Sequence, residues 1–193
     1  MKNNETVELP FLDGKLLVAM PGMGDLRFEH TVIFVCAHTP EGAMGLIINR
    51  KARDLQFGDL LAQLDIQWDG IAEAPEVHLG GPIEHGRGFV LHSPDYDVED
   101  STMAISDDFG MTATLDVLRD IATSNGPEHA LLALGYSGWG PGQLENEIRE
   151  NGWLIADATP ELVFHIAANK KWTAAINSLG IDPNMLAAAG GRA

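Results

Sequence analysis

The sequence predicts a single-domain α+β (mixed α/β) protein, built on a mixed β-sheet with helices packed on its faces. Short apolar runs separated by glycine and proline fill the first third of the chain, and apolar residues recur at helical spacing further on. Strand-like and helix-like segments interleave without a regular strand–helix–strand rhythm, which favours a mixed sheet over a doubly wound parallel one. A length of 193 residues suits one domain spanning residues 1–193.

The expected strands are the short apolar runs. They cover residues 16–20, 32–37, 46–48, 77–79, 88–92, 102–105, 130–136 and 153–156. The run at 32–37 is apolar on both faces, which is typical of a central strand. The loop 79–91 is expected to form a hairpin or a broader turn.

The expected helices follow from apolar residues that recur every three or four positions. They cover residues 57–64, 111–122 and 169–179, the last with Gly180 as its C-terminal cap. Another helix is expected from Pro141 to Gly152, because proline is favoured at the first helical position. The termini, 1–13 and 187–193, are expected to be flexible.

The chain is strongly acidic, with 12 basic against 28 acidic residues and a formal net charge of −16. Such a field repels polyanions, and basic residues cluster only at Arg50, Lys51 and Arg53, with a Lys170–Lys171 pair elsewhere. Phosphate contacts require a basic face, so we expect no direct binding to nucleic acid.

Cysteine use and hydropathy predict the compartment. The single cysteine, Cys36, cannot form an internal disulfide and lies in an apolar run, which favours a buried thiol in a reducing compartment. No apolar run approaches the length of a membrane helix, and the first residues lack the pattern of a secretory signal. We therefore expect a cytoplasmic, monomeric protein that does not contact membranes.

The stretch GYSGWGPGQLE (135–145) resembles a nucleophile elbow, with Ser137 after an apolar strand and before a helix. Asp157 and His165 follow in the order that such hydrolases use. However, Trp139 occupies the position of the second elbow glycine, and the helix is expected to start only at Pro141. A turn shaped by glycines explains more of these residues, with Gln143 capping the first amides of the helix.

Cys36 is the other candidate nucleophile, since His38 lies two residues away on the same strand face. Same-face neighbours on one strand are about 7 Å apart, too far for a hydrogen bond between them. A core cysteine is therefore favoured. A hydrolase using Ser137 or Cys36 is retained as the alternative function.

No cofactor or metal is expected. His78 and His92 would face each other across a symmetric hairpin and, with Glu84, could hold a metal ion, but no cysteine pair or helical histidine pair accompanies them. The loop Gly22-Met-Gly24 starts like a dinucleotide-binding turn, yet Arg27 stands at the position of the third glycine.

Four segments resemble the bacterial AlgH/YqgE family, in order and over nearly the whole chain. They are residues 16–50, 79–95, 134–154 and 170–182, of which GAMGLIIN (42–49) and GW-x-x-GQLE-x-E (138–147) are the most specific. The resemblance implies a compact cytosolic protein with a coiled, branching mixed β-sheet and helices packed on it. It implies no particular biochemical activity, although one branch is linked by name to regulation of exopolysaccharide synthesis.

We therefore expect a protein that acts by binding an unknown protein partner or small ligand, with regulation as one outcome of binding, and we favour this function over that of an enzyme. The candidate surface combines exposed polar and aromatic groups on glycine-shaped turns. It consists of Asn49, Arg50, Gly80, Gly81, Pro82, Trp139 and Gln143. Whether these loops converge in space does not follow from the sequence.

Overall fold

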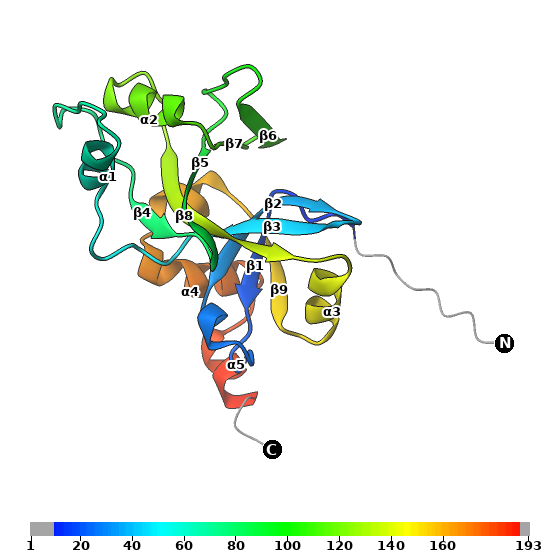
Figure 1. Ribbon diagram of the computed structural model, residues 1–193. Coiled ribbons are helices and arrows are strands. Elements are labelled where there is room, and N and C mark those ends of the chain that lie inside the picture. Colours follow the sequence, from blue (N-terminus) through cyan, green and yellow to red (C-terminus); the bar gives the residue numbers. More distant parts are fainter. Residues whose placement is uncertain (1–9, 190–193) are drawn as a thin grey trace.

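The computed structural model describes residues 10–189, which form a curled sheet with helices around it (Figure 1). The strands are β1 (Lys15–Ala19), β2 (Val32–Thr39), β3 (Gly42–Ile47), β4 (Val77–Leu79), β5 (Ile83–His92), β6 (Thr102–Ser106), β7 (Phe109–Thr112), β8 (Ala130–Trp139) and β9 (Trp153–Asp157). The helices are α1 (Phe57–Gln63), α2 (Leu115–Ala122), α3 (Gln143–Arg149), α4 (Ala168–Ser178) and α5 (Pro183–Ala189), with a 3-10 turn at Leu26–Phe28 and a π-helical turn at Glu161–His165.

The nine strands form one mixed sheet that branches at β8. Its order is β6-β7-β5-β8-β3-β2-β1-β9, and β4 adds a parallel pairing to β8. One edge of β8 pairs with β5, whereas its other edge pairs first with β4, at 132–134, and then with β3, at 137–139. This arrangement confirms the predicted fold class, a coiled and branching mixed sheet with helices.

Glycine makes the branch possible. Gly135 lies between the two pairings on β8 and has a φ of +73°, and a Cβ atom there would lie 2.8 Å from the carbonyl oxygens of Gly81 and Ile83. A side chain at this position would therefore be both strained and crowded. Gly135 lets β8 change direction and pairing partner without ending the strand.

The centre of the sheet, around β1 and β2, is buried on both faces. On one face, alternate residues such as Leu16, Phe34 and Leu46 pack with the π-helical turn and α4. On the other face, Leu17 and Ile33 pack with the start of α3 and with β9. A third apolar cluster joins α1 and α2 to β4, β5 and β8. These two helices lie at the opposite end of the molecule from α5 (Figure 1).

Several expected boundaries differ in the structure. Met111 lies in β7 and not in a helix, because the residues around it pair with both β5 and β6, and α2 begins only at Leu115. The segments 77–79 and 88–92 do not form a hairpin, because β4 and β5 flank β8 on opposite edges. Strand β8 continues to Trp139, and α3 begins at Gln143, later than the expected start at Pro141.

Leu12 and Asp13, which lie in a segment expected to be flexible, bond to β2. Leu12 is 2% exposed and its amide donates to His38 Nδ1, while the Asp13 carboxylate accepts from the His38 amide. At the other end, α5 includes residues 187–189. The remaining residues of both predicted flexible termini, 1–9 and 190–193, lie outside the described residues.

Candidate functional site

The Gly80-Gly81-Pro82 turn lies between two pockets and is wedged against β8. The Gly80 amide donates to Leu134, and its carbonyl accepts from Ile47, each at 2.8 Å. A Cβ atom on Gly81 would lie 2.1 Å from the carbonyl carbon of Tyr136. The residues on either side of the two glycines line different pockets. Pro82 lines the first pocket described below, and Leu79 lines the second.

The first pocket, which we call the tryptophan cleft, has a volume of about 630 Å³ and lies beside α3. It is formed by the loop from Met20 to Phe28, the Pro82–Ile83 segment, the end of β8 and the α3–β9 connection. Its lining residues are Met20, Pro21, Gly22, Met23, Gly24, Asp25, Arg27, Phe28, Pro82, Ile83, Gly138, Trp139, Gln143, Glu147, Glu150, Asn151, Gly152 and Trp153.

Glu147 of α3 organises one wall of the tryptophan cleft. Its Oε2 accepts hydrogen bonds from the indole N–H groups of Trp139, at 2.9 Å, and Trp153, at 2.8 Å. Its Oε1 accepts from the Gln143 side-chain amide at 2.9 Å, and Gln143 Oε1 in turn accepts from the Gly140 amide. The polar atoms of this wall therefore bond to one another, and the wall presents a fixed aromatic shape.

The same helix is tied to β2 through Glu145. His38 Nδ1 accepts from the Leu12 amide, so Nε2 carries the proton and donates to Glu145 Oε1 at 2.9 Å. Burial raises the pKa of the Glu145 carboxyl, but hydrogen bonds from its own backbone and from His38 outweigh burial and leave the pKa below its usual value. The acidic residues of the GQLE-x-E stretch thus hold α3 against the sheet.

The second pocket, which we call the basic pocket, has a volume of about 580 Å³ and lies where α4 begins. Its lining residues are Asn49, Arg50, Lys51, Arg53, Leu79, Ala168 and Asn169. Asn49 has a structural role, because its side chain accepts a hydrogen bond from the Val32 amide and donates one to the His30 carbonyl.

A buried lysine positions α4 beside this pocket. Lys171 is 2% exposed, and its ammonium group donates to the carbonyls of Ile48, at 3.0 Å, and Val163, at 2.6 Å. Burial lowers the pKa of Lys171 to about 8. The same burial, together with the Lys171 charge, lowers the pKa of His78 to about 4, so that this histidine is neutral near pH 7.

The structure thus divides the candidate surface between the two pockets. Pro82, Trp139 and Gln143 line the tryptophan cleft, and Asn49 and Arg50 line the basic pocket. Gly80 and Gly81 are buried in the turn between the two pockets. Their role is structural, because they allow the backbone of the turn to pass close to β8. Sequence reasoning missed Glu147 and Trp153, although the regular spacing of acidic residues along α3 was the signal that could have found Glu147.

The geometry does not support Ser137 as a nucleophile. Its side chain is fully buried, and its Oγ donates to the Gly80 carbonyl at 3.4 Å. Asp157 instead pairs with Lys15 at 2.7 Å, and His165 packs edge-on against His129, with ring centroids 4.6 Å apart. The three residues that follow the hydrolase order are therefore engaged in unrelated contacts.

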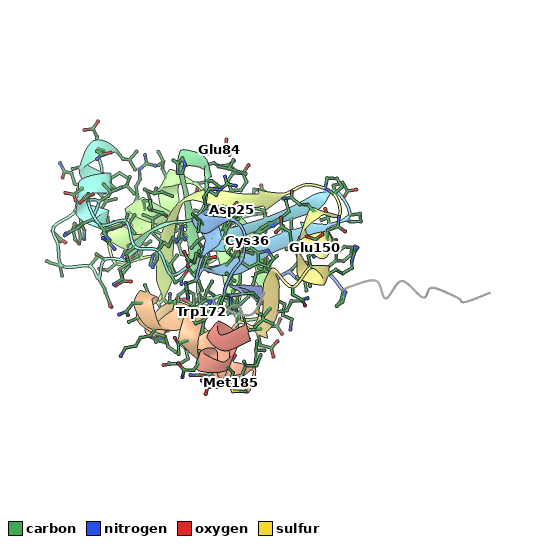
Figure 2. The ribbon with its side chains drawn as sticks, turned by 90° about the horizontal axis from the view of Figure 1, so that it is seen from below. Asp25, Cys36, Glu84, Glu150, Trp172 and Met185 are labelled. Atoms are coloured by element: carbon green, nitrogen blue, oxygen red, sulfur yellow. The ribbon has the colours of Figure 1, made fainter. Side chains whose placement is uncertain are left out.

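Cys36 lies in the interior of the molecule (Figure 2) and is 2% exposed. Burial raises the pKa of its thiol far above the usual value, so the reactive thiolate is disfavoured. A β-bulge shifts the register of β2 between Val35 and Ala37. Cys36 packs in the cluster beneath α4, while His38 bonds to Glu145 of α3, so the expected same-face pair is not formed.

The histidines expected across a hairpin are also separated. His78 on β4 and His92 on β5 lie on strands that flank β8, and His92 bonds to Thr112 and to the Ser93 carbonyl. Glu84 contacts Arg87. Within residues 10–189, no three His, Cys, Asp or Glu side chains are grouped as metal ligands, and no helix is long and apolar enough to cross a membrane.

Comparison with known sequences identifies close relatives. A model of the AlgH-like family matches residues 16–184. A UPF0301 protein of Ruegeria pomeroyi is 58% identical over 183 residues, which cover 94% of this chain and 99% of that protein. A UPF0301 protein of Nitrobacter hamburgensis is 55% identical over 190 residues, covering 95% and 88% of the two chains.

Solved structures agree with this relationship. The solution structure of the AlgH protein from Pseudomonas aeruginosa superposes with a TM-score of 0.75 at 36% identity, covering 100% of both chains. A crystal structure from Corynebacterium diphtheriae shares the fold, with a TM-score of 0.72 at 21% identity over 97% of this chain and 94% of that one. The resemblance seen in the sequence is therefore confirmed: this chain belongs to the AlgH-like family.

Proposed function

We propose that the protein acts by binding a protein partner in the tryptophan cleft, and that any regulatory effect follows from that complex. The observation that supports this proposal is the cleft itself, in which an aromatic wall faces a loop that carries Met20 and Met23. Methionine side chains adapt their shape to a ligand, and a concave site that combines apolar and polar groups is a usual place for binding.

The charges around the cleft favour a partner segment that is both apolar and basic. Asp25, Glu147 and Glu150 all line it, and Glu150 lies at the edge of the molecule (Figure 2). Asp25 is paired with Arg27, but Glu150 takes part in no ion pair among residues 10–189. The net charge of −16 also attracts basic partners and repels acidic ones.

We do not propose a hydrolase. Both candidate nucleophiles, Ser137 and Cys36, are buried, and neither has a general base within hydrogen-bond distance among the described residues. The cytoplasm is the proposed site of action, because the one cysteine is a buried thiol, as is typical of proteins in a reducing compartment.

Affinity capture of the full chain from its native cells at mild salt tests the proposal. We expect a defined partner to be recovered with the wild-type protein and to be lost with Met23→Lys, which places a positive charge in the cleft against a basic partner. Met103→Lys is the matched control, because Met103 is 38% exposed on β6 and does not line the cleft. A loss of about tenfold or more is expected from burying a like charge without a counter-ion in the interface.

The outcome is interpretable only if both variants fold. Thermal unfolding followed by circular dichroism checks this, and Met23→Gln offers a polar but uncharged replacement if Met23→Lys is unstable. Equal recovery of the partner by wild type, Met23→Lys and Met103→Lys would show that binding occurs elsewhere.

A further inference from the structure

The basic pocket is a second site, independent of the tryptophan cleft, and its charge contrasts with the rest of the molecule. In a chain with a net charge of −16, three of its seven lining residues are cationic: Arg50, Lys51 and Arg53. Cations gathered around a hollow raise the local concentration of anions even when the whole molecule is acidic.

Among residues 10–189, most of this positive charge has no ion-pair partner. Lys51 pairs with Glu76, but Arg50 donates only to the Glu29 carbonyl, at 3.2 Å, and Arg53 takes part in no ion pair among residues 10–189. Three cations against one carboxylate leave two positive charges. That balance matches one dianionic group.

The segment carrying these cations is held in place by the sheet. The Arg50 carbonyl accepts from the Leu79 amide, and the Ala52 amide donates to the Val77 carbonyl, each at 2.8 Å. The backbone of Lys51 also forms an isolated antiparallel β-bridge with that of His78, so the segment continues the sheet beside β4. A site on a fixed backbone loses less entropy when it binds a ligand.

Helix α4 completes the opposite wall with its first residues, Ala168 and Asn169. Lys171 fixes this end of the helix to Ile48, next to the basic segment in the chain. The first amides of a helix lack carbonyl partners one turn earlier and can donate to an anion at that end. In α4 the Lys170 amide already donates to the Ala167 carbonyl, so the amides of Ala168 and Asn169 are the ones that face this role. They add to the two arginines, whose planar N–H groups match the geometry of a phosphate.

We propose that the basic pocket binds the dianionic phosphate group of a small phosphate ester. A volume of about 580 Å³ exceeds the size of one phosphate ion and leaves space for a small organic group next to Leu79, which is 45% exposed. Nucleic acid is disfavoured, because a polyanion must also approach the acidic surface outside the pocket.

Titration of the isotopically labelled full chain, followed by backbone NMR, tests the proposal. The probes are inorganic phosphate and glycerol 3-phosphate in a low-salt buffer, with chloride at equal ionic strength as the reference. We expect saturable shifts of the Arg50, Ala168 and Asn169 amides, with tighter binding of the ester than of inorganic phosphate. Absence of saturable shifts up to millimolar concentrations, or an equal response to chloride, would overturn the proposal.

The double variant Arg50→Gln, Arg53→Gln is expected to weaken ester binding by about tenfold or more, because charge-assisted hydrogen bonds to the phosphate are lost. The double variant Arg87→Gln, Arg149→Gln changes the net charge equally, outside the basic pocket, and is expected to stay within about twofold of wild type. Equal weakening by both pairs would assign the effect to the overall field and not to this pocket. Thermal unfolding establishes that each variant is folded.

Two further probes separate the possible sources of the phosphate group. Vesicles containing phosphatidic acid test a lipid headgroup, and a short DNA duplex tests nucleic acid. Neither is expected to shift the pocket amides more strongly than glycerol 3-phosphate does. A stronger response to either would replace the small ester as the ligand.

Discussion

The tryptophan cleft and the basic pocket are separated by one short turn but use their polar groups in opposite ways. In the cleft, the Glu147 carboxylate accepts hydrogen bonds from the side chains of Trp139, Trp153 and Gln143. In the basic pocket, Arg50 and Arg53 form no ion pair among residues 10–189. The aromatic wall of the cleft is therefore fixed by hydrogen bonds within the protein, whereas the arginines of the pocket are left to pair with a ligand.

This difference shows that the most recognisable residues of the chain are not the freest to bind. The GW-x-x-GQLE-x-E stretch carries much of the family resemblance, yet its carboxylates bond within the protein. A buried or half-buried carboxylate with full hydrogen bonding is a structural element, because removing its partners is costly. Of the two arginines without an ion pair, Arg50 directly follows the GAMGLIIN stretch, and Arg53 lies outside the segments that carry the resemblance.

The largest expected effect concerns the turn that both sites share. Gly81→Ala would place a Cβ atom 2.1 Å from the Tyr136 carbonyl carbon and 2.2 Å from its oxygen. Because both atoms are backbone of β8, relief requires movement of the strand, and we expect a loss of about 3 kcal/mol or more in the free energy of unfolding. Urea denaturation followed by circular dichroism measures it.

Gly86→Ala is the control for this substitution. Its added Cβ would meet no heavy atom within 4 Å, and we expect a change within about 0.5 kcal/mol. Equal stability of the two variants would mean that the turn can move away from β8, and the two pockets would then not share a rigid boundary.

The second effect is confined to the cleft. Glu147→Ala removes the acceptor of two indole N–H groups, on Trp139 and Trp153, which are 7% and 3% exposed. We expect it to cost about 2 kcal/mol of unfolding free energy and to shift tryptophan emission, since buried donors without partners are penalised. Glu147→Gln keeps an acceptor oxygen and should cost less, and Glu150→Ala should be nearly neutral. Similar stability of Glu147→Ala and Glu150→Ala would show that the carboxylate is not structural.

The fold was largely predictable from the sequence where apolar runs are continuous. The first two strands were located correctly because residues buried on both faces of a sheet leave an unbroken apolar pattern, whereas β3 begins four residues before the predicted run, at Gly42. The end of β8 was missed because Gly135, Gly138 and Gly140 resemble a turn, whereas Gly135 bends a strand that continues. Local composition does not reveal which partner strand a glycine must accommodate.

The sites were less predictable because they are assembled from distant segments. Trp139 and Gln143 were identified from one stretch, but the methionine loop across the cleft precedes them by more than a hundred residues in the chain. The Arg50–Arg53 cluster was visible as charge, but not the pocket, because the start of α4 forms its other wall. Lys171 resembled a solvated lysine, and only packing shows that it is buried.

The smallest effect concerns Lys171, which supports the basic pocket alone. Burial lowers its pKa in the folded protein to about 8, from an ordinary value of 10.5. The folded state therefore releases this proton at lower pH than the unfolded state, so stability should rise with pH between these two values. The neutral amine can still donate to the carbonyls of Ile48 and Val163, so its contacts survive deprotonation.

Lys171→Met removes this titration. We expect the difference in unfolding free energy between wild type and Lys171→Met to shift in favour of wild type by about 1 kcal/mol between pH 7.5 and pH 9. The nearby charged groups are Glu76 and Lys51, and His78, whose pKa is lowered to about 4, stays neutral throughout this range. Lys170→Met, at an exposed neighbouring position, should follow the pH dependence of wild type. If wild type and Lys171→Met instead change in parallel, Lys171 is solvated in solution, and the wall that α4 gives to the basic pocket is not fixed by a buried cation.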